Sequence, residues 1–83
     1  MPSIEHYEAL RSDIVRLLRE ERERRELSKY IVAKRSEVSQ SMLSLVERGL
    51  RNPTMELLFR IAGGIGAELP TIIKKAQQAK TKC

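Results

Sequence analysis

The chain has 83 residues, which is enough for one domain with a modest core but not for a second domain or a deep catalytic cleft. Hydrophobic residues make up 41% and aromatic residues only 4%, with no tryptophan, so we expect an aliphatic, helical core. The net charge of +5 favours a polyanionic partner, although a basic surface that only confers solubility has the same composition. No apolar run approaches the roughly 18 residues that a membrane helix needs.

Residues that carry chemistry are scarce. His6 is the single histidine and stands in a charged setting without a Ser–His–Asp or Cys–His set, and Cys83 has no second cysteine to pair with. The "GGIG" at 63–66 follows a helical run and lacks the lysine of a phosphate-binding loop. The N-terminus lacks the layout of a signal peptide. We therefore expect no enzyme, cofactor, metal or small-molecule substrate, no membrane contact, and a reducing cytoplasmic location.

The first predicted element is a long helix. Apolar residues recur at spacings of three and four, which predicts a helix of roughly five turns with Ser3 as its cap. These residues are Ile4, Tyr7, Leu10, Ile14, Leu17 and Leu18. The following "REERERRE", residues 19–26, mixes both signs of charge, as is typical of a solvated helix face.

Two short helices follow. Ser28 is suited to cap "KYIVAKRS", residues 29–36, and Glu37 with Val38 forms the predicted turn. Ser39 then caps the next helix, which Gly49 ends because glycine tolerates the left-handed conformation found there.

Two further helices complete the predicted domain. Asn52 and Pro53 indicate a loop, and Thr54 caps a helix over 55–65 that Gly66 closes. The last helix begins near Leu69, and from residue 77 we expect a fraying basic tail. We expect five core residues in the second and fourth helices: Ile31, Val32, Leu58, Phe59 and Ile61. The fold class is thus a compact all-α domain over 14–76, with 1–13 as an extension of the first helix and 77–83 as the tail.

The third helix, "SQSMLSLVERG", is unusual because short neutral polar residues occupy its outer face. The major groove of DNA admits one helix whose N-terminal residues meet base edges, and glutamine can bond adenine at two atoms. Serine can donate or accept and lets the backbone approach closely. Val38, Leu43 and Val46 would anchor the opposite face. The sequence therefore predicts a helix that reads DNA bases.

The segment from about Ile14 to Ala76 resembles the Cro/C1-type (XRE family) helix-turn-helix domains of phage repressors and restriction-modification controller proteins. The matching residues are Leu27-Ser28, Ala33, Val38-Ser39, Ser44, Val46-Glu47-Arg48-Gly49, Asn52-Pro53-Thr54, Ala62 and Gly66. The resemblance implies a five-helix, lambda-repressor-like fold and a sequence-specific transcriptional regulator that binds double-stranded DNA, usually as a homodimer on an inverted repeat. The chain departs from the usual family pattern at Lys29, Ser36 and Glu37, where glutamine, a bulky apolar residue and glycine are common.

The resemblance also implies site residues. The recognition helix is expected over about 39–48, with four base-reading residues: Gln40, Ser41, Ser44 and Leu45. Phosphate contacts are expected from Lys29, Tyr30, Ser39, Arg48, Arg51 and Asn52. Tyr30 can instead pack its ring against the helix, and Leu45 can touch thymine methyl groups or face a partner. Arg22 and Glu47 match positions that form a partly buried ion pair in some relatives.

The fifth helix suggests a dimer interface. Its apolar stripe consists of Leu69, Ile72, Ile73 and Ala76, and the two adjacent isoleucines point about 100° apart, so one of them is expected to face outward. The alternative is that both belong to the core. A second reading of the whole chain is an antitoxin or other protein-interaction module, for which residues 1–13 could bind the partner; a neighbouring toxin gene or restriction-enzyme gene would separate these readings. An RNA-binding adaptor is less well supported because it would need more aromatic residues for stacking.

Overall fold

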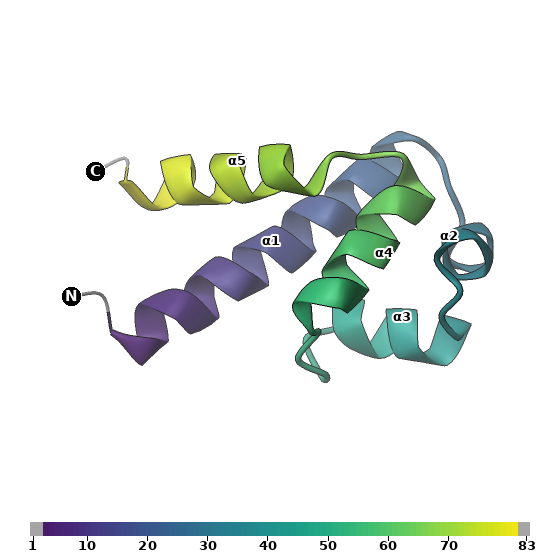
Figure 1. The fold of residues 1–83 in the computed structure, drawn as a ribbon, viewed down its shortest axis with the longest axis horizontal. Coiled ribbons are helices and arrows are strands. Elements are labelled where there is room, and N and C mark those ends of the chain that lie inside the picture. Colours follow the sequence, from purple (N-terminus) through teal and green to yellow (C-terminus); the bar gives the residue numbers. More distant parts are fainter. Residues whose placement is uncertain (1–2, 82–83) are drawn as a thin grey trace.

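The computed structural model describes residues 3–81 and contains five helices. These are α1 (Ile4–Arg24), α2 (Lys29–Ser36), α3 (Gln40–Glu47), α4 (Met55–Ile65) and α5 (Leu69–Thr81) (Figure 1). There is no strand within the described range, so the predicted all-α class with five helices is confirmed. The molecule measures 38 × 22 × 18 Å.

Hydroxyl side chains start four of the helices, as the sequence predicts. Each cap residue has an extended backbone, and its side-chain oxygen accepts a hydrogen bond from the backbone N–H three residues later. The pairs are Ser3 with His6 at 3.2 Å, Ser28 with Ile31 at 3.1 Å, Ser39 with Met42 at 3.0 Å and Thr54 with Leu57 at 3.1 Å. Each cap satisfies a donor that the first helical turn leaves unpaired.

The same four helices share one backbone motif at their C-terminal ends. A residue in the left-handed conformation follows each helix, and two backbone hydrogen bonds reach back across the last turn, as in a Schellman motif. Gly49 and Gly66 fill this position after α3 and α4 with φ of 74° and 87°. Glu26 and Glu37 fill it after α1 and α2 with φ of 55° and 58°, where a side chain is strained. The departure from glycine at Glu37 therefore changes the strain of the turn but not its shape.

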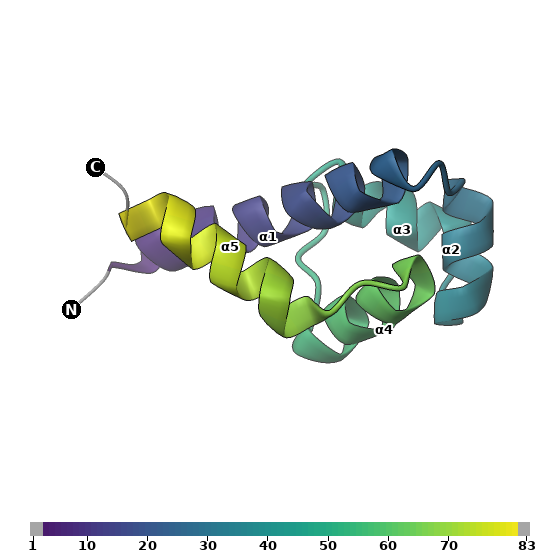
Figure 2. The same ribbon diagram turned by 90° about the horizontal axis from the view of Figure 1, so that it is seen from above.

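Helix α4 lies at the centre of the fold. It packs against α1, α2 and α5, while α3 packs against α1 and α2. Helix α3 lies at the opposite side of the domain from α5 (Figure 1), and residues of the α3–α4 loop line a pocket together with residues of α1. Helices α1 and α5 lie side by side in both views, and the start of α1 and the end of α5 lie at the same end of the molecule (Figures 1 and 2).

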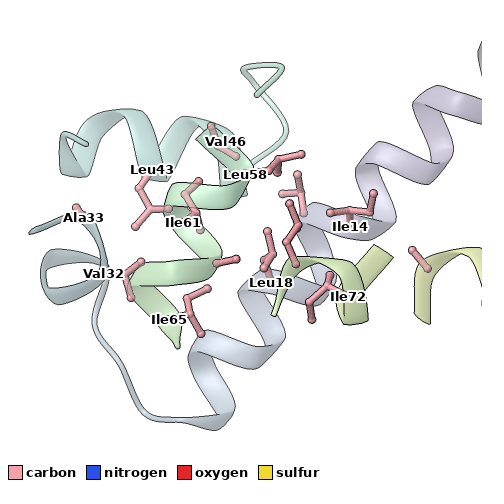
Figure 3. Close-up of a cluster of buried hydrophobic side chains, with 14 residues drawn as sticks. Ile14, Leu18, Val32, Ala33, Leu43, Val46, Leu58, Ile61, Ile65 and Ile72 are labelled. Carbon is pink, nitrogen blue, oxygen red and sulfur yellow. The ribbon is translucent and has the colours of Figure 1, made fainter. Parts of the chain in front are cut away.

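All five helices contribute to a single aliphatic core (Figure 3). Its buried residues are Ile14, Val15, Leu18, Val32, Ala33, Leu43, Val46, Leu58, Ile61, Ala62, Ile65, Leu69, Ile72 and Ala76. Of the predicted core residues, Ile31 is only half-buried and Phe59 is 52% exposed, so the prediction for Phe59 is wrong. Phe59 lies one turn after the exposed Met55, on the side of α4 that faces away from the core.

Helix α5 differs from two predictions. It continues to Thr81, so residues 77–81 are helical rather than a frayed tail; residue 82 and Cys83 lie outside the described residues. Leu69, Ile72 and Ala76 are buried within the single chain, at 4% exposure or less, because α5 packs on α1 and α4. Their assignment to a dimer interface is therefore wrong. Ile73 is half-buried and packs against the edge of the core, so it is the more exposed of the two isoleucines.

Helices α2 and α4 approach each other closely at Ser36 and Gly64. Ser36 is buried, and its Oγ has no hydrogen-bond partner in the described part of the chain. A Cβ atom added at Gly64 would lie 2.2 Å from Ser36 Oγ and 2.9 Å from the Val32 carbonyl oxygen. The small residue at 36, where a bulky apolar one is usual, is thus matched by a glycine on the facing helix.

Candidate nucleic-acid interface

The outer face of α3 gathers the predicted base-reading residues. Gln40, Ser41, Ser44, Leu45 and Arg48 together line one hollow on the surface. Gln40, Ser41 and Arg48 are exposed, whereas Ser44 and Leu45 are half-buried. Leu43 and Val46, on the inner face, are buried in the core and fix the orientation of the helix. The hollow therefore presents an amide, two hydroxyls, an apolar side chain and one guanidinium to whatever approaches α3.

The predicted phosphate-binding residues of α2 and of the turn lie in three different settings. Lys29 is half-buried at the first position of α2. Tyr30 is 57% exposed, and Lys34 Nζ lies 5.9 Å from the centroid of its ring, within reach of a cation–π interaction. The hydroxyl of Ser39 accepts a hydrogen bond from Met42 N, and its own hydrogen remains to be donated to a phosphate oxygen.

The remaining predicted phosphate contacts follow α3. Arg48 ends the helix, and Arg51 and Asn52 are exposed in the α3–α4 loop. Arg51 and Asn52 have no acidic partner within residues 3–81, so their donors face solvent. Arg48, Arg51 and Asn52 line one pocket together with residues of α1.

A buried ion pair joins α1 to the last residue of α3. Arg22 Nε lies 2.8 Å from Glu47 Oε2, and Arg22 Nη2 lies 2.9 Å from Glu47 Oε1, which is the parallel two-bond geometry of a strong pair. Arg22 Nη1 also donates to the Leu27 carbonyl oxygen at 2.8 Å. Both side chains are more than nine-tenths buried. One guanidinium thus holds the end of α3 and the α1–α2 loop together.

The arrangement just described, a helix, a short turn and an exposed second helix, agrees with a family comparison. A helix-turn-helix family model, of the Cro/C1 type, matches residues 18–72. The chain belongs to the Cro/C1-type helix-turn-helix family. No curated protein and no solved structure matches it. Membership indicates a DNA-binding regulator of the XRE type and agrees with the predicted resemblance.

This Cro/C1-type domain also has a polar network that the sequence reasoning missed. Arg25 Nη1 donates to the carbonyl oxygens of Ile65 and Gly66 at 3.0 and 2.8 Å, and so caps the C-terminal end of α4. Hydrogen bonds from Arg24 and Arg25 lower the pKa of Glu21 below its ordinary value of 4.5. Because 19–26 reads as a solvated charge run, the sequence gives no signal for the contact of Arg25 with α4.

The described part of this Cro/C1-type domain has no helix that could cross a membrane and no cluster of side chains that could hold a metal ion. None of its helices is both long and apolar enough to cross a membrane. Residues 3–81 contain no group of three or more His, Cys, Asp or Glu side chains placed to hold a metal ion.

Proposed function

We propose that the chain is a sequence-specific transcriptional regulator that binds double-stranded DNA with α3 in the major groove. The observation that supports this proposal is the chemistry of the outer face of α3. Gln40, Ser41 and Ser44 lie in one hollow, and within residues 3–81 none of these side chains is committed to a hydrogen bond. Their donors and acceptors are therefore free to pair with base edges. Lysines in their place would bind phosphates without distinguishing bases.

The flanking residues support the same orientation. Lys29 and Tyr30 at the start of α2, with Arg48, Arg51 and Asn52 after α3, supply donors before and after the reading helix in the chain. Phosphate contacts of this kind fix the register of a protein on the duplex. In this proposal the regulator acts in the cytoplasm, where DNA is accessible.

The experiment begins with selection of bound DNA from a random pool. Gln40→Ala is expected to weaken binding to the selected site by about 1–3 kcal/mol and to relax preference at one base position. Arg51→Ala is expected to weaken all sequences alike and to reduce the salt slope by about one unit. Lys75→Ala is the matched control, because this exposed lysine lies on α5, which is on the opposite side of the domain from α3 (Figure 1). An unchanged selected sequence for Gln40→Ala would refute the assigned face.

We also propose that two copies bind an inverted repeat, since one short helix gives limited affinity and linked copies multiply it. Ile73 is the residue of α5 left for this contact, because the rest of its stripe is buried. Two-fold symmetry would set the recognition helices about 34 Å apart, one turn of DNA. Light scattering of wild type and Ile73→Lys, free and on DNA, tests the dimer. A wild type that stays monomeric in both states would rule it out.

A further inference from the structure

A pocket of about 270 Å³ lies between α1 and the α3–α4 loop. Five arginines line it, three from one face of α1 and two from the end of α3 and the loop: Arg11, Arg16, Arg19, Arg48 and Arg51. The three α1 residues are not among the phosphate-binding residues that the sequence predicts, and two of them precede residue 18, where the family match begins.

The positive charge of the pocket is poorly balanced. Arg16 is paired with Glu20 at 2.9 Å and with Asp13 at 3.7 Å. The other four arginines have no acidic partner among residues 3–81. Glu47 is the one acidic residue among the described residues that line the pocket, and both of its oxygens are bonded to Arg22. The pocket therefore has a strong excess of positive charge, which favours an anion.

Arg19 is the most informative of the five. Its Nε is buried, and no hydrogen-bond partner for this atom exists in the described structure. Arg22, about one turn further along α1, shows the contrast, since its Nε, Nη1 and Nη2 all donate to protein oxygens. A buried donor without an acceptor is unfavourable and is expected to have a ligand or water as its partner. A guanidinium donates through a pair of N–H groups, which match two oxygens of a phosphate.

We propose that this pocket binds a backbone phosphate of the DNA, next to the contacts of α3, with Arg19 and Arg11 as its principal donors. The inference rests on the proposed function. A free phosphate compound offers the same oxygens, but the position of the pocket favours DNA. Arg48 lines both the pocket and the hollow on α3, and Arg51 and Asn52 of the loop that follows Arg48 line the pocket as well. A strand that follows the loop from the reading face therefore reaches the pocket.

The test replaces phosphates of the selected DNA site one at a time by uncharged methylphosphonates. With the wild-type protein, replacement of one phosphate outside the base pairs that α3 contacts is expected to weaken binding roughly 10- to 100-fold. This is the effect of losing a hydrogen bond to a charged group. Arg19→Gln is expected to bind the unmodified site with an affinity lower by a similar factor, and its affinity should not fall further when that same phosphate is replaced. Its salt slope, and that of Arg11→Gln, should fall by about one unit. Lys75→Gln should behave as wild type, and thermal unfolding of each variant checks that it is folded.

The outcomes separate the two proposals. If the wild type selects no DNA sequence, the proposed function fails, and the phosphate contact fails with it. If the wild type selects a site but no methylphosphonate weakens its binding without also weakening that of Arg19→Gln, only the phosphate contact of the pocket is refuted. Inorganic phosphate is titrated in parallel while the side-chain nitrogen resonance of Arg19 is followed. If inorganic phosphate binds but no methylphosphonate weakens DNA binding through Arg19, the pocket is assigned to a free phosphate compound and the DNA contact is overturned.

Discussion

Glu47→Ala removes the carboxylate that neutralises a buried arginine, and the structure sets the size of the effect. Arg22 and Glu47 are 9% and 6% exposed, and two short hydrogen bonds join them. Breaking a pair at this depth leaves one charge desolvated and costs about 3–5 kcal/mol. A domain of this length has a free energy of unfolding of about 4–12 kcal/mol, so the loss is a large part of the total. At about 4–8 °C per kcal/mol, the melting temperature should fall by at least about 12 °C.

The pair should also be non-additive. Arg22→Met strands the Glu47 carboxylate and removes the donor to the Leu27 carbonyl oxygen. In the double variant Arg22→Met/Glu47→Ala no charge is left buried, so the loss should be much smaller than the sum of the two single losses. A stability loss of about 1–3 kcal/mol is expected to remain in the double variant, because the Leu27 carbonyl oxygen still lacks its hydrogen-bond partner.

Urea and thermal unfolding followed by circular dichroism measure these free energies. The matched control is Glu56→Ala on α4, which breaks an ion pair with Arg60 of similar length, 2.9 Å, but with exposed side chains. Its loss should be below about 1 kcal/mol. A stability loss for Glu47→Ala no larger than that for Glu56→Ala, or additive losses at Arg22 and Glu47, would contradict a strong contribution of the buried pair.

Four further substitutions test the packing and the charges. Gly64→Ala should lower stability by about 1–3 kcal/mol in urea unfolding because its Cβ would overlap Ser36, whereas Ser36→Ala, which removes a buried unpaired hydroxyl, should be neutral or stabilising. Glu37→Gly should raise stability by up to about 1 kcal/mol because glycine relieves the left-handed strain; a loss would contradict this. The lowered pKa of Glu21 means that its contribution to stability is present above its unfolded pKa and lost as pH falls through its folded pKa. Glu21→Gln should therefore reduce the decline in melting temperature below about pH 4.5, and an unchanged decline would exclude the carboxylate as its cause.

The sequence predicts the local features of this fold well because they depend on neighbouring residues. Ser28, Ser39 and Thr54 cap helices by bonds that span three residues, so their chemistry can be read without tertiary structure. Glu26 was missed because glutamate after a helix carries none of the glycine signal that identifies Gly49.

Predictions of burial were less reliable because they depend on how helices face one another. Leu57, Leu58 and Phe59 are consecutive, and periodicity alone does not decide which of them turns outward. The stripe at Leu69 and Ile72 has the same spacing whether it covers the core or a second subunit. Packing of α5 on α1 decides between these, and that contact joins residues far apart in the sequence.

The polar groups of α3 and of its cap residue are divided between two tasks. Ser39 and Glu47 stabilise the ends of the helix, whereas Gln40, Ser41 and Ser44 make no hydrogen bond through their side chains within residues 3–81. Substitutions on such a surface usually change stability by less than about 0.5 kcal/mol. On the proposed function, a duplicated gene could therefore acquire a different operator preference through a few codon changes without passing through an unstable intermediate. The outer face of α3 is accordingly the place to redesign the specificity of this protein.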